Sequence, residues 1–338
     1  MDSITQFVLG AAIGEAIAGK KIGNKAILWG GIAGTIPDLD VILSPFLDEV
    51  QRLTIHRSIT HSLLFAFVFA PLLAYLLHRY YRSEKASFRD WTLLLFWGIF
   101  THPLLDACTT YGTQLFAPFS DYRVGLNNIF IVDFFYTLPL LIGVIICLFL
   151  SRSSVKRRYI NTAALLLSTG YLALSLFNKQ IIDKQFERAF AEQHISYKRY
   201  LTGVTPLNIF LWYAVAETET GYYMGYRSLF DKTSSVELVY IPRNEQLIAD
   251  IKDDYAIDRL LWFCKDYYSV RERDGKLYLY DLKFGMSGVD PKEEKFVFYF
   301  ELYKDPISGE GKWHELFNRD EVKMGEAFKQ MWTRIKGV

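Results

Sequence analysis

Histidines and aspartates recur in short motifs through the first part of the chain. His102 and Asp106 are four residues apart in THPLLDA, so on a helix they share one face and could bind one metal ion. Neutral imidazole together with carboxylate suits zinc, and also manganese or iron(II). The alternative for this pair is a hydrogen-bonded polar contact inside a helical bundle.

Two further motifs add side chains of the same kinds. TIPDLD contributes Asp38 and Asp40 beside Pro37, which removes a backbone donor and interrupts an otherwise apolar segment. HRSITHS contributes His56 and His61, which would lie about 140° apart on a continuous helix, so a bend is needed between them. The alternatives are a loop of solvated acids and histidines with a structural role.

Together these motifs supply three imidazoles and three carboxylates, enough for one or two divalent ions. The candidate metal ligands are Asp38, Asp40, His56, His61, His102 and Asp106. A two-metal arrangement, favoured by additional carboxylates, would polarise a phosphoryl or acyl oxygen. Arg57 is the candidate for binding an anionic group such as a phosphate. Asp133 is a candidate outer-shell partner or general base, with a structural role as the alternative.

Long apolar runs indicate that these side chains are positioned by membrane helices. Hydrophobic residues make up 51% of the chain, and the longest apolar runs lie within residues 1–177. A bilayer core is crossed by about 20 mostly apolar residues. We count about six such segments, and therefore predict a membrane α-helical bundle. The segments 4–18 and 26–43 are the weakest, because they carry Glu15, several glycines and a proline.

The distribution of Lys and Arg predicts how the bundle is oriented. Basic residues cluster in the connections at 20–25, 79–89 and 152–158, whereas the connections at 44–62 and 109–128 carry few positive charges. The basic connections are expected in the cytoplasm. All the candidate ligands then fall at the opposite, extracytoplasmic face, and so does the C-terminal half.

Beyond residue 198 the sequence predicts an extramembrane α+β domain with a mostly antiparallel sheet. Runs of alternating aromatic and polar residues indicate strands, and the turn Arg273-Asp274-Gly275 leads into one of them. Strands are expected at 206–218, 221–230, 236–242, 275–285 and 295–303, and helices at 244–252, 257–263 and 321–335. We interpret the domain as a lid or substrate-selecting domain, with purely structural packing as the alternative.

The predicted domain organisation has three parts. They are a transmembrane helical bundle with a metal site at 1–177, an amphipathic connecting helix at 178–198, and an extracytoplasmic α+β domain at 199–338. The net charge of +1 does not suggest a nucleic-acid partner. The three cysteines are far apart and form no CxxC motif, which argues against a disulfide framework or a thiolate zinc site.

The motifs PDLD, HRSITHS and THPLLDACTTYGTQLFAPFS, after the start MDSITQ, in combination resemble the YdjM-like family of bacterial inner-membrane metal-dependent hydrolases. The resemblance covers residues 1 to about 150. It implies a multi-pass protein of the bacterial inner membrane with a metal site at the aspartates and histidines of these motifs. Some relatives have a histidine where this chain has Gln6, which implies fewer bound metals or Gln6 as an outer-shell donor.

These observations predict a membrane-bound, metal-dependent hydrolase. It would hold one or two divalent ions, with zinc favoured and manganese or iron possible, and metal-bound hydroxide would be the nucleophile. Because the ligands lie at headgroup depth, the expected substrate is a membrane lipid or lipid-linked phosphoester. The alternatives are a non-enzymatic metal- or proton-linked transport or sensing protein, and an envelope scaffold. The candidate ligands are expected at one level of the membrane rather than along a path through it, which favours a metal site over a transport pathway.

Overall fold

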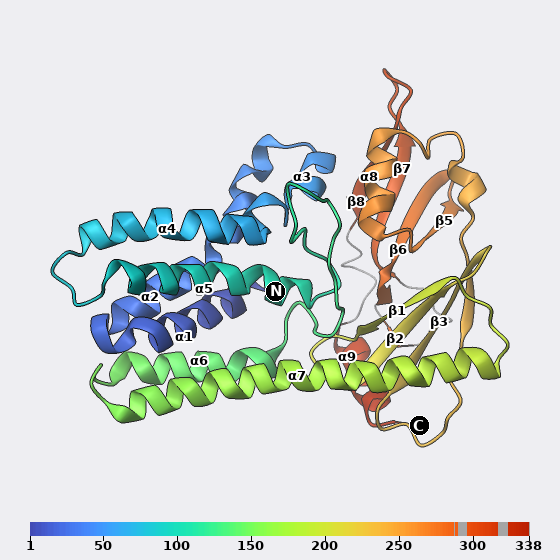
Figure 1. Ribbon diagram of the computed structural model, residues 1–338. Helices are drawn as coiled ribbons and strands as arrows, with labels where there is room; N and C mark the ends of the chain where they lie inside the picture. The colour runs from blue at the N-terminus through green and yellow to red at the C-terminus, as the bar shows by residue number, and fades with distance from the viewer. Residues whose placement is uncertain (287, 290–295, 317–323, 338) are drawn as a thin grey trace. The chain divides into compact units, whose positions relative to one another are not determined.

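The computed structural model describes residues 1–286, 288–289, 296–316 and 324–337 (Figure 1). The chain forms two compact units, each described here by itself. The first unit comprises Met1–Asp48 and Thr54–Ser175, and the second comprises Glu49–Leu53 and Leu176–Val338. The first unit is helical, whereas the second contains two antiparallel sheets.

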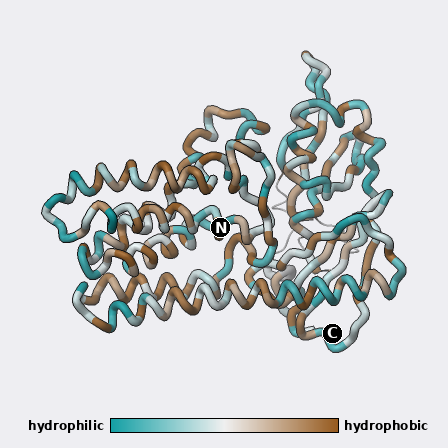
Figure 2. Tube along the Cα trace, in the orientation of Figure 1, coloured by the Kyte–Doolittle hydropathy of each residue, from teal (hydrophilic) through white to brown (hydrophobic). Residues whose placement is uncertain are grey.

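The first unit is built from apolar helices joined by polar connections (Figure 2). Its elements are α1 (Ser3–Ile22), α2 (Asn24–Thr35), the 3-10 helices η1 (Ile36–Phe46) and η2 (Ile59–His61), α4 (Leu63–Tyr80), α5 (Phe88–Ala107), α6 (Phe134–Phe149) and the first part of α7 (Val155–Glu192). A short helix, α3 (Glu49–Ile55), precedes η2.

Three segments of the described chain are long and apolar enough to cross a membrane. They are Asn24–Phe46, Leu63–Tyr80 and Val155–Glu192, and α6 is apolar but shorter. The predicted helical membrane region is therefore present, whereas the count of about six crossings is not confirmed. The helices α1 and α5 have ordinary helical length, but Glu15 in α1 and the polar residues of α5 reduce their hydropathy.

Glycines bring the backbones of α1 and α2 into close contact. A Cβ atom on Gly10 would lie 2.3 Å from the carbonyl oxygen of Gly30, and one on Gly14 would lie 2.2 Å from that of Ala26. Small residues spaced four apart on two helices permit this approach in a membrane, where close van der Waals packing drives association. The same contact surface includes Gly34, whose carbonyl group serves the site described below.

Two breaks in the helices position the polar motifs. The interruption predicted at Pro37 is present, because α2 ends at Thr35 and η1 begins with the proline in its first turn. The bend needed between the two histidines of HRSITHS is also present. Arg57 has a φ of 61° between the end of α3 and the start of η2, a conformation that is uncommon for a residue with a side chain.

The second unit contains two four-stranded antiparallel sheets, in the orders β1-β2-β3-β4 and β5-β6-β7-β8. The strands are β1 (Arg199–Val204), β2 (Leu211–Glu217), β3 (Gly221–Ser228), β4 (Val239–Pro242), β5 (Tyr268–Arg273), β6 (Lys276–Met286), β7 (Phe296–Lys304) and β8 (Gly311–Leu316). Two α-helices, α8 (Tyr255–Cys264) and α9 (Met324–Ile335), and the 3-10 helix η3 (Glu245–Ile248) accompany them.

The second unit follows the strand predictions only in part. Five strands, β2, β3, β4, β6 and β7, lie at the predicted positions, and the turn before β6 has both Asp274 and Gly275 in the left-handed region, as a two-residue hairpin requires. The strands β1, β5 and β8 lie outside the predicted ranges. In place of the helix predicted at 244–252 there is the short η3. Residues 295 and 321–323 of the predicted elements lie outside the described residues.

The helix α7 is continuous from Val155 to Glu192, so the expected last span and most of the expected connecting helix form one element. Its second half is amphipathic. Ile182, Phe186 and Phe190 are fully buried and recur every four residues, whereas Lys184, Glu187 and Arg188 between them are exposed. This spacing places an apolar stripe on one side of the helix.

Two arginines bind the carboxylate of Glu217 at the end of β2. Arg199 Nε donates to Glu217 Oε2, and Arg243 NH2 donates to Oε1, each at 2.5 Å. Burial alone would raise the pKa of Glu217, but the hydrogen bonds from the two arginines hold it below its usual value. The ionised carboxylate therefore stabilises the folded domain at neutral pH.

This pKa shift predicts an acid-sensitive contribution to stability. We expect Glu217→Gln to lower the free energy of unfolding of the C-terminal unit at pH 7 by about 1.5–3 kcal/mol, the range for hydrogen bonds to charged groups. Since the pKa is lowered by folding, the contribution is complete above the unfolded pKa of about 4.3 and is lost as the pH falls through the folded pKa. Denaturant titrations at neutral and acidic pH, with exposed Glu219→Gln as control, measure this. An equal loss of unfolding free energy in Glu217→Gln at both pH values would contradict this prediction.

Candidate metal centre

Four of the predicted ligands converge in the first unit. Asp38 from η1, His61 from η2, and His102 and Asp106 from α5 each offer one ligand atom within 4.8 Å of the other three. His61 Nε2 lies 3.2 Å from Asp38 Oδ1 and 3.6 Å from Asp106 Oδ2. His102 Nε2 lies 3.2 Å from His61 Nε2, 3.4 Å from Asp38 Oδ1 and 3.7 Å from Asp106 Oδ2.

Five of the six separations within the group are close to those around a single tetrahedral ion, and the sixth is within 4.8 Å. Ligand atoms at about 2.0–2.2 Å from zinc, arranged in a tetrahedron, are about 3.3–3.6 Å apart. The five separations given above run from 3.2 to 3.7 Å. The group could therefore hold one metal ion with little rearrangement of its side chains.

The hydrogen bonds around the group leave lone pairs directed into it. His102 Nδ1 donates to the carbonyl oxygen of Gly34 at 2.6 Å, which leaves Nε2 as the ring nitrogen that could bind a metal ion. Asp106 Oδ2 is buried and has no hydrogen-bond partner among the described residues. Burial lowers the pKa of His61 to about 4, so this imidazole is neutral at pH 7. A bound cation would contact one ligand atom from each of the four residues.

The other two predicted ligands lie beside this group. Asp40 Oδ2 is 3.6 Å from His61 Nδ1, on the side of the ring away from the other ligands, and accepts the Arg57 backbone N–H at 3.2 Å. His56 Nδ1 is 3.2 Å from Asp40 Oδ1. The 3.6 Å between Asp40 Oδ2 and His61 Nδ1 is too long for a hydrogen bond, but Thr60 Oγ1 lies 3.1 Å from His61 Nδ1 and donates to Asp40 Oδ2 at 3.4 Å. Thr60 therefore links Asp40 to the imidazole of His61, and His56 contacts Asp40.

The guanidinium group of Arg57 is buried against the same carboxylate group. Its Nε lies 3.1 Å from Asp106 Oδ2, without the angle of a hydrogen bond, and its NH1 donates to Thr109 Oγ1 at 3.1 Å. The ring of Tyr111 lies 4.6 Å from the guanidinium carbon. Arg57 thus places a positive charge next to the ligand group, where it balances one of the carboxylates.

Residues outside the three metal motifs also contact the ligand group or lie near it. Gln6 Nε2 donates to Asp106 Oδ1 at 2.9 Å and to the His102 carbonyl oxygen at 3.2 Å, which is the outer-shell position expected for this residue. The carbonyl group of Gly34 was not predicted, because a backbone acceptor leaves no signal in residue type. Asp133 caps α6 by accepting the backbone N–H groups of Phe135 and Tyr136, at 2.9 and 3.2 Å.

The ligand group can be approached from the side of Asp38. The side chain of Asp38 is 21% exposed, whereas those of the other three ligands are at most 1% exposed. Apolar side chains of the same 3-10 helix flank this opening, since Leu39, Ile42 and Phe46 are 53%, 62% and 83% exposed. The accessible ligand therefore lies on a surface that suits contact with hydrocarbon.

Comparison with known proteins places the helical unit in a family. A model of the YdjM inner membrane protein family matches residues 1–182. The chain is 34% identical over 122 residues to the inner membrane protein YbcI of Escherichia coli (strain K12), which covers 36% of this chain and 69% of YbcI. It is 32% identical over 139 residues to YfhP of Bacillus subtilis (strain 168), which covers 38% of this chain and 41% of YfhP.

No solved structure matches the chain. The family match includes every segment that contributes to the ligand group, together with the apolar helices that support a location in the inner membrane. Because this match spans more than half of the chain, the protein belongs to the YdjM inner membrane protein family.

Proposed function

We propose that this protein is a metal-dependent hydrolase of the inner membrane that acts on a lipid or lipid-linked phosphoester. The observation that carries the proposal is the convergence of Asp38, His61, His102 and Asp106 with the separations of a tetrahedral ion. We favour one zinc ion, with manganese or iron as alternatives, because two imidazoles and two carboxylates suit these metals. From the distribution of Lys and Arg we place the site on the extracytoplasmic side.

In such a site, different residues of the chain would bind the ion, orient its ligands and meet the substrate. A divalent ion held by the four ligands would act as a Lewis acid for a phosphoryl oxygen, and it would have to expand to five ligands to bind and activate a water molecule. His61 is held in orientation by the hydroxyl group of Thr60, and His102 by the carbonyl group of Gly34. Asp38 is the ligand exposed to an arriving substrate.

Two features support an anionic, lipid substrate. Arg57 places a guanidinium group beside the ligands, and guanidinium groups bind phosphate oxygens through planar pairs of hydrogen bonds. The exposed apolar residues of η1 around Asp38 would hold that opening at the membrane surface. A phosphate group attached to hydrocarbon would then meet the ligand group without leaving the bilayer.

The test is an assay of the purified protein in phospholipid nanodiscs. We expect the metal-loaded parent to release phosphate or a phosphorylated headgroup from a panel of lipid phosphoesters. We expect Asp106→Asn to reduce this rate at least about a hundredfold, since it changes a metal ligand. A lipid phosphoester should be preferred over a soluble aryl phosphate. Absence of hydrolysis of every lipid by a fully metal-loaded parent would contradict the proposal.

A second candidate function is metal- or proton-linked transport. It is favoured by a second buried ionic group in the helical unit, the pair Glu15 and Arg157, which lies nine residues along α1 from Gln6. Ionisable groups at separate depths are typical of transport paths. Flux of protons or metal ions in liposomes, abolished by Glu15→Gln but without any hydrolysis, would favour this function.

A further inference from the structure

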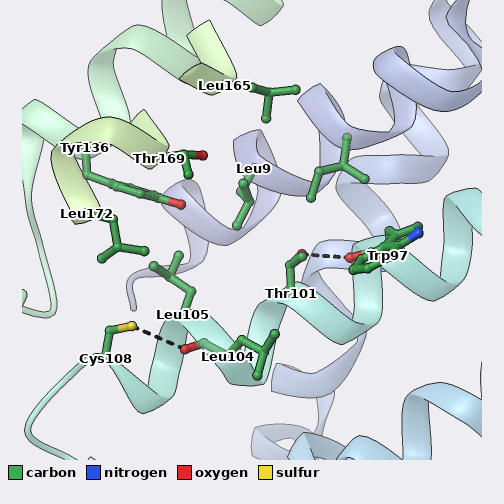
Figure 3. A pocket seen from close by; sticks show the side chains of 11 residues that line it. Leu9, Trp97, Thr101, Leu104, Leu105, Cys108, Tyr136, Leu165, Thr169 and Leu172 are labelled. Carbon is green, nitrogen blue, oxygen red and sulfur yellow. Dashed lines mark hydrogen bonds between the residues drawn. The ribbon is translucent and has the colours of Figure 1, made fainter. Parts of the chain in front are cut away.

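A cavity of about 480 Å³ opens between four helices of the first unit (Figure 3). Helices α1, α5, α6 and α7 all contribute to its walls. Most of the side chains that line it are apolar, among them Leu9, Ile13, Trp97, Leu105, Leu165 and Leu172. This volume is within the range of sites that bind small organic molecules.

The cavity is separate from the metal centre. On α5, Leu104 follows His102 by two residues and therefore lies about 200° around the helix from it. Cys108 lies in a similar direction, about 240° from His102, whereas Asp106 lies only about 40° away. Leu105, which also lines the cavity, lies about 60° from His102 on the other side, so the cavity and the two ligands lie on different faces of α5.

One polar group in the cavity lacks a partner. The side chain of Tyr136 is 97% buried, since the residue is 3% exposed, and its hydroxyl group points into the cavity (Figure 3). Among the described residues this hydroxyl group has no hydrogen-bond partner. A hydroxyl group in apolar surroundings is costly unless it is hydrogen-bonded. Because the hydroxyl group faces the cavity, an acceptor on an occupant of the cavity could pair with it.

The cavity is polar at one end and apolar at the other. Tyr136 lies in the first turn of α6, and Figure 3 shows it near Cys108 and Leu172, with Trp97 at the far side. Trp97 and Cys108 are eleven residues apart on α5, a rise of about 16 Å along the helix. An occupant with an acceptor at one end and a long apolar part fits this arrangement.

The open side of the cavity continues into the surface expected to face lipid. Two of the residues that line the cavity, Trp97 and Leu104, are 43% and 38% exposed. The helix α7 is one of the segments long and apolar enough to cross the membrane. The cavity is therefore accessible from the hydrocarbon of the bilayer, and the hydrophobic surface around it requires no aqueous entrance.

We propose that this cavity binds one acyl chain of a glycerolipid, with the Tyr136 hydroxyl group donating a hydrogen bond to an ester carbonyl oxygen of that lipid. The apolar walls match the hydrocarbon chain, and the hydroxyl group lies at the end of the helices where an ester group would be found. This site does not depend on the proposed hydrolase activity, because it lies on a different face of α5.

The experiment is native mass spectrometry of the full chain released from nanodiscs. One set of nanodiscs contains phosphatidylglycerol with ester-linked chains, and the other contains the same lipid with ether-linked chains. We expect the parent to retain one ester-linked lipid, and to retain the ether-linked lipid less well. Tyr136→Phe should reduce retention of the ester-linked lipid about two- to tenfold, the effect of one hydrogen bond, and should abolish the preference for it.

A matched pair of tryptophan variants tests the cavity itself. Leu165→Trp fills the cavity, whereas Leu166→Trp places the same side chain on the exposed neighbouring position of α7. We expect at least tenfold less retained lipid in Leu165→Trp and no change in Leu166→Trp. If Leu165→Trp does not fold, Thr169→Trp at the edge of the cavity replaces it.

Three results would overturn the proposal. Equal lipid retention by the cavity-filling variant and Leu166→Trp would exclude the cavity as the binding site. Equal retention of ester- and ether-linked lipids by the parent would exclude the assigned role of Tyr136. A dimeric parent that becomes monomeric in the cavity-filling variant would identify a second copy of the chain as the occupant instead of a lipid.

Discussion

Replacing His102 with alanine is expected to lower the affinity of the protein for a divalent metal ion by more than about a hundredfold. Outer-shell partners of metal ligands typically contribute about 10–100-fold to affinity, and a ligand should contribute more. His102 Nε2 lies within 3.2–3.7 Å of ligand atoms from all three other residues of the group. Its loss leaves three ligands and opens one side of the group.

The matched control is His56→Ala. His56 belongs to the same sequence motif as His61, but its contact is with Asp40, outside the group of four ligands. We expect His56→Ala to lower metal affinity tenfold at most. We expect Asp40→Asn to lower metal affinity by about 10–100-fold, an effect between those of His56→Ala and His102→Ala, because Asp40 lies behind the ring of His61.

Competition with a chelating dye, on detergent-purified variants whose helical content matches the parent, measures these affinities. An equally large loss in His56→Ala and His102→Ala would mean that the ion is bound by a wider set of ligands than the four. A parent that binds zinc, manganese and iron no better than His102→Ala would exclude the metal centre altogether.

Breaking the buried ion pair between Glu15 and Arg157 is the second change with a large expected effect. Arg157 Nε donates to Glu15 Oε1 at 2.7 Å and NH2 donates to Oε2 at 2.5 Å, and the two side chains are 6% or less exposed. Arg157 NH1 also donates to Asn24 Oδ1 at 2.9 Å, so the guanidinium group joins α7 to α1 and α2. Arg157→Leu leaves the carboxylate of Glu15 buried without its partner.

We expect Arg157→Leu to lower the free energy of unfolding by about 3–5 kcal/mol, the usual result of removing one partner of a buried pair. The double variant Glu15→Leu, Arg157→Leu should recover most of this loss, because it removes the unpaired charge as well. Lys21→Leu is the control, since the pair of Lys21 and Asp90 is partly exposed and such pairs contribute about 1 kcal/mol or less.

Reversible unfolding in mixed detergent micelles, followed by tryptophan fluorescence, measures all three variants. Two outcomes would count against a stabilising role. One is a loss below about 1 kcal/mol in Arg157→Leu, and the other is a double variant that is less stable than the single one. Either result would leave Glu15 as an ionisable group available for transport.

The sequence determined the parts of this protein that depend on local pattern. Apolar runs identified the helical membrane region, and the alternation of aromatic and polar residues identified five of the eight strands. The helix break at Pro37 and the hairpin turn at Asp274 and Gly275 followed from the backbone preferences of those residues. The strands β1, β5 and β8 were not predicted, because strand formation depends on pairing with neighbouring strands as well as on local residue type.

Only the tertiary structure decided which polar residues form the candidate metal centre. The motifs gave six ligands of suitable type, but residue type and spacing do not say which way two side chains of one motif point. His61 faces Asp38 and His102, whereas Asp40 and His56 contact each other beside them. That difference depends on the backbone conformation of Arg57 and on the close packing of α1 with α2, which places the Gly34 carbonyl group against His102. Ligand sets formed from separate segments depend on such long-range contacts, and these leave no trace in local sequence.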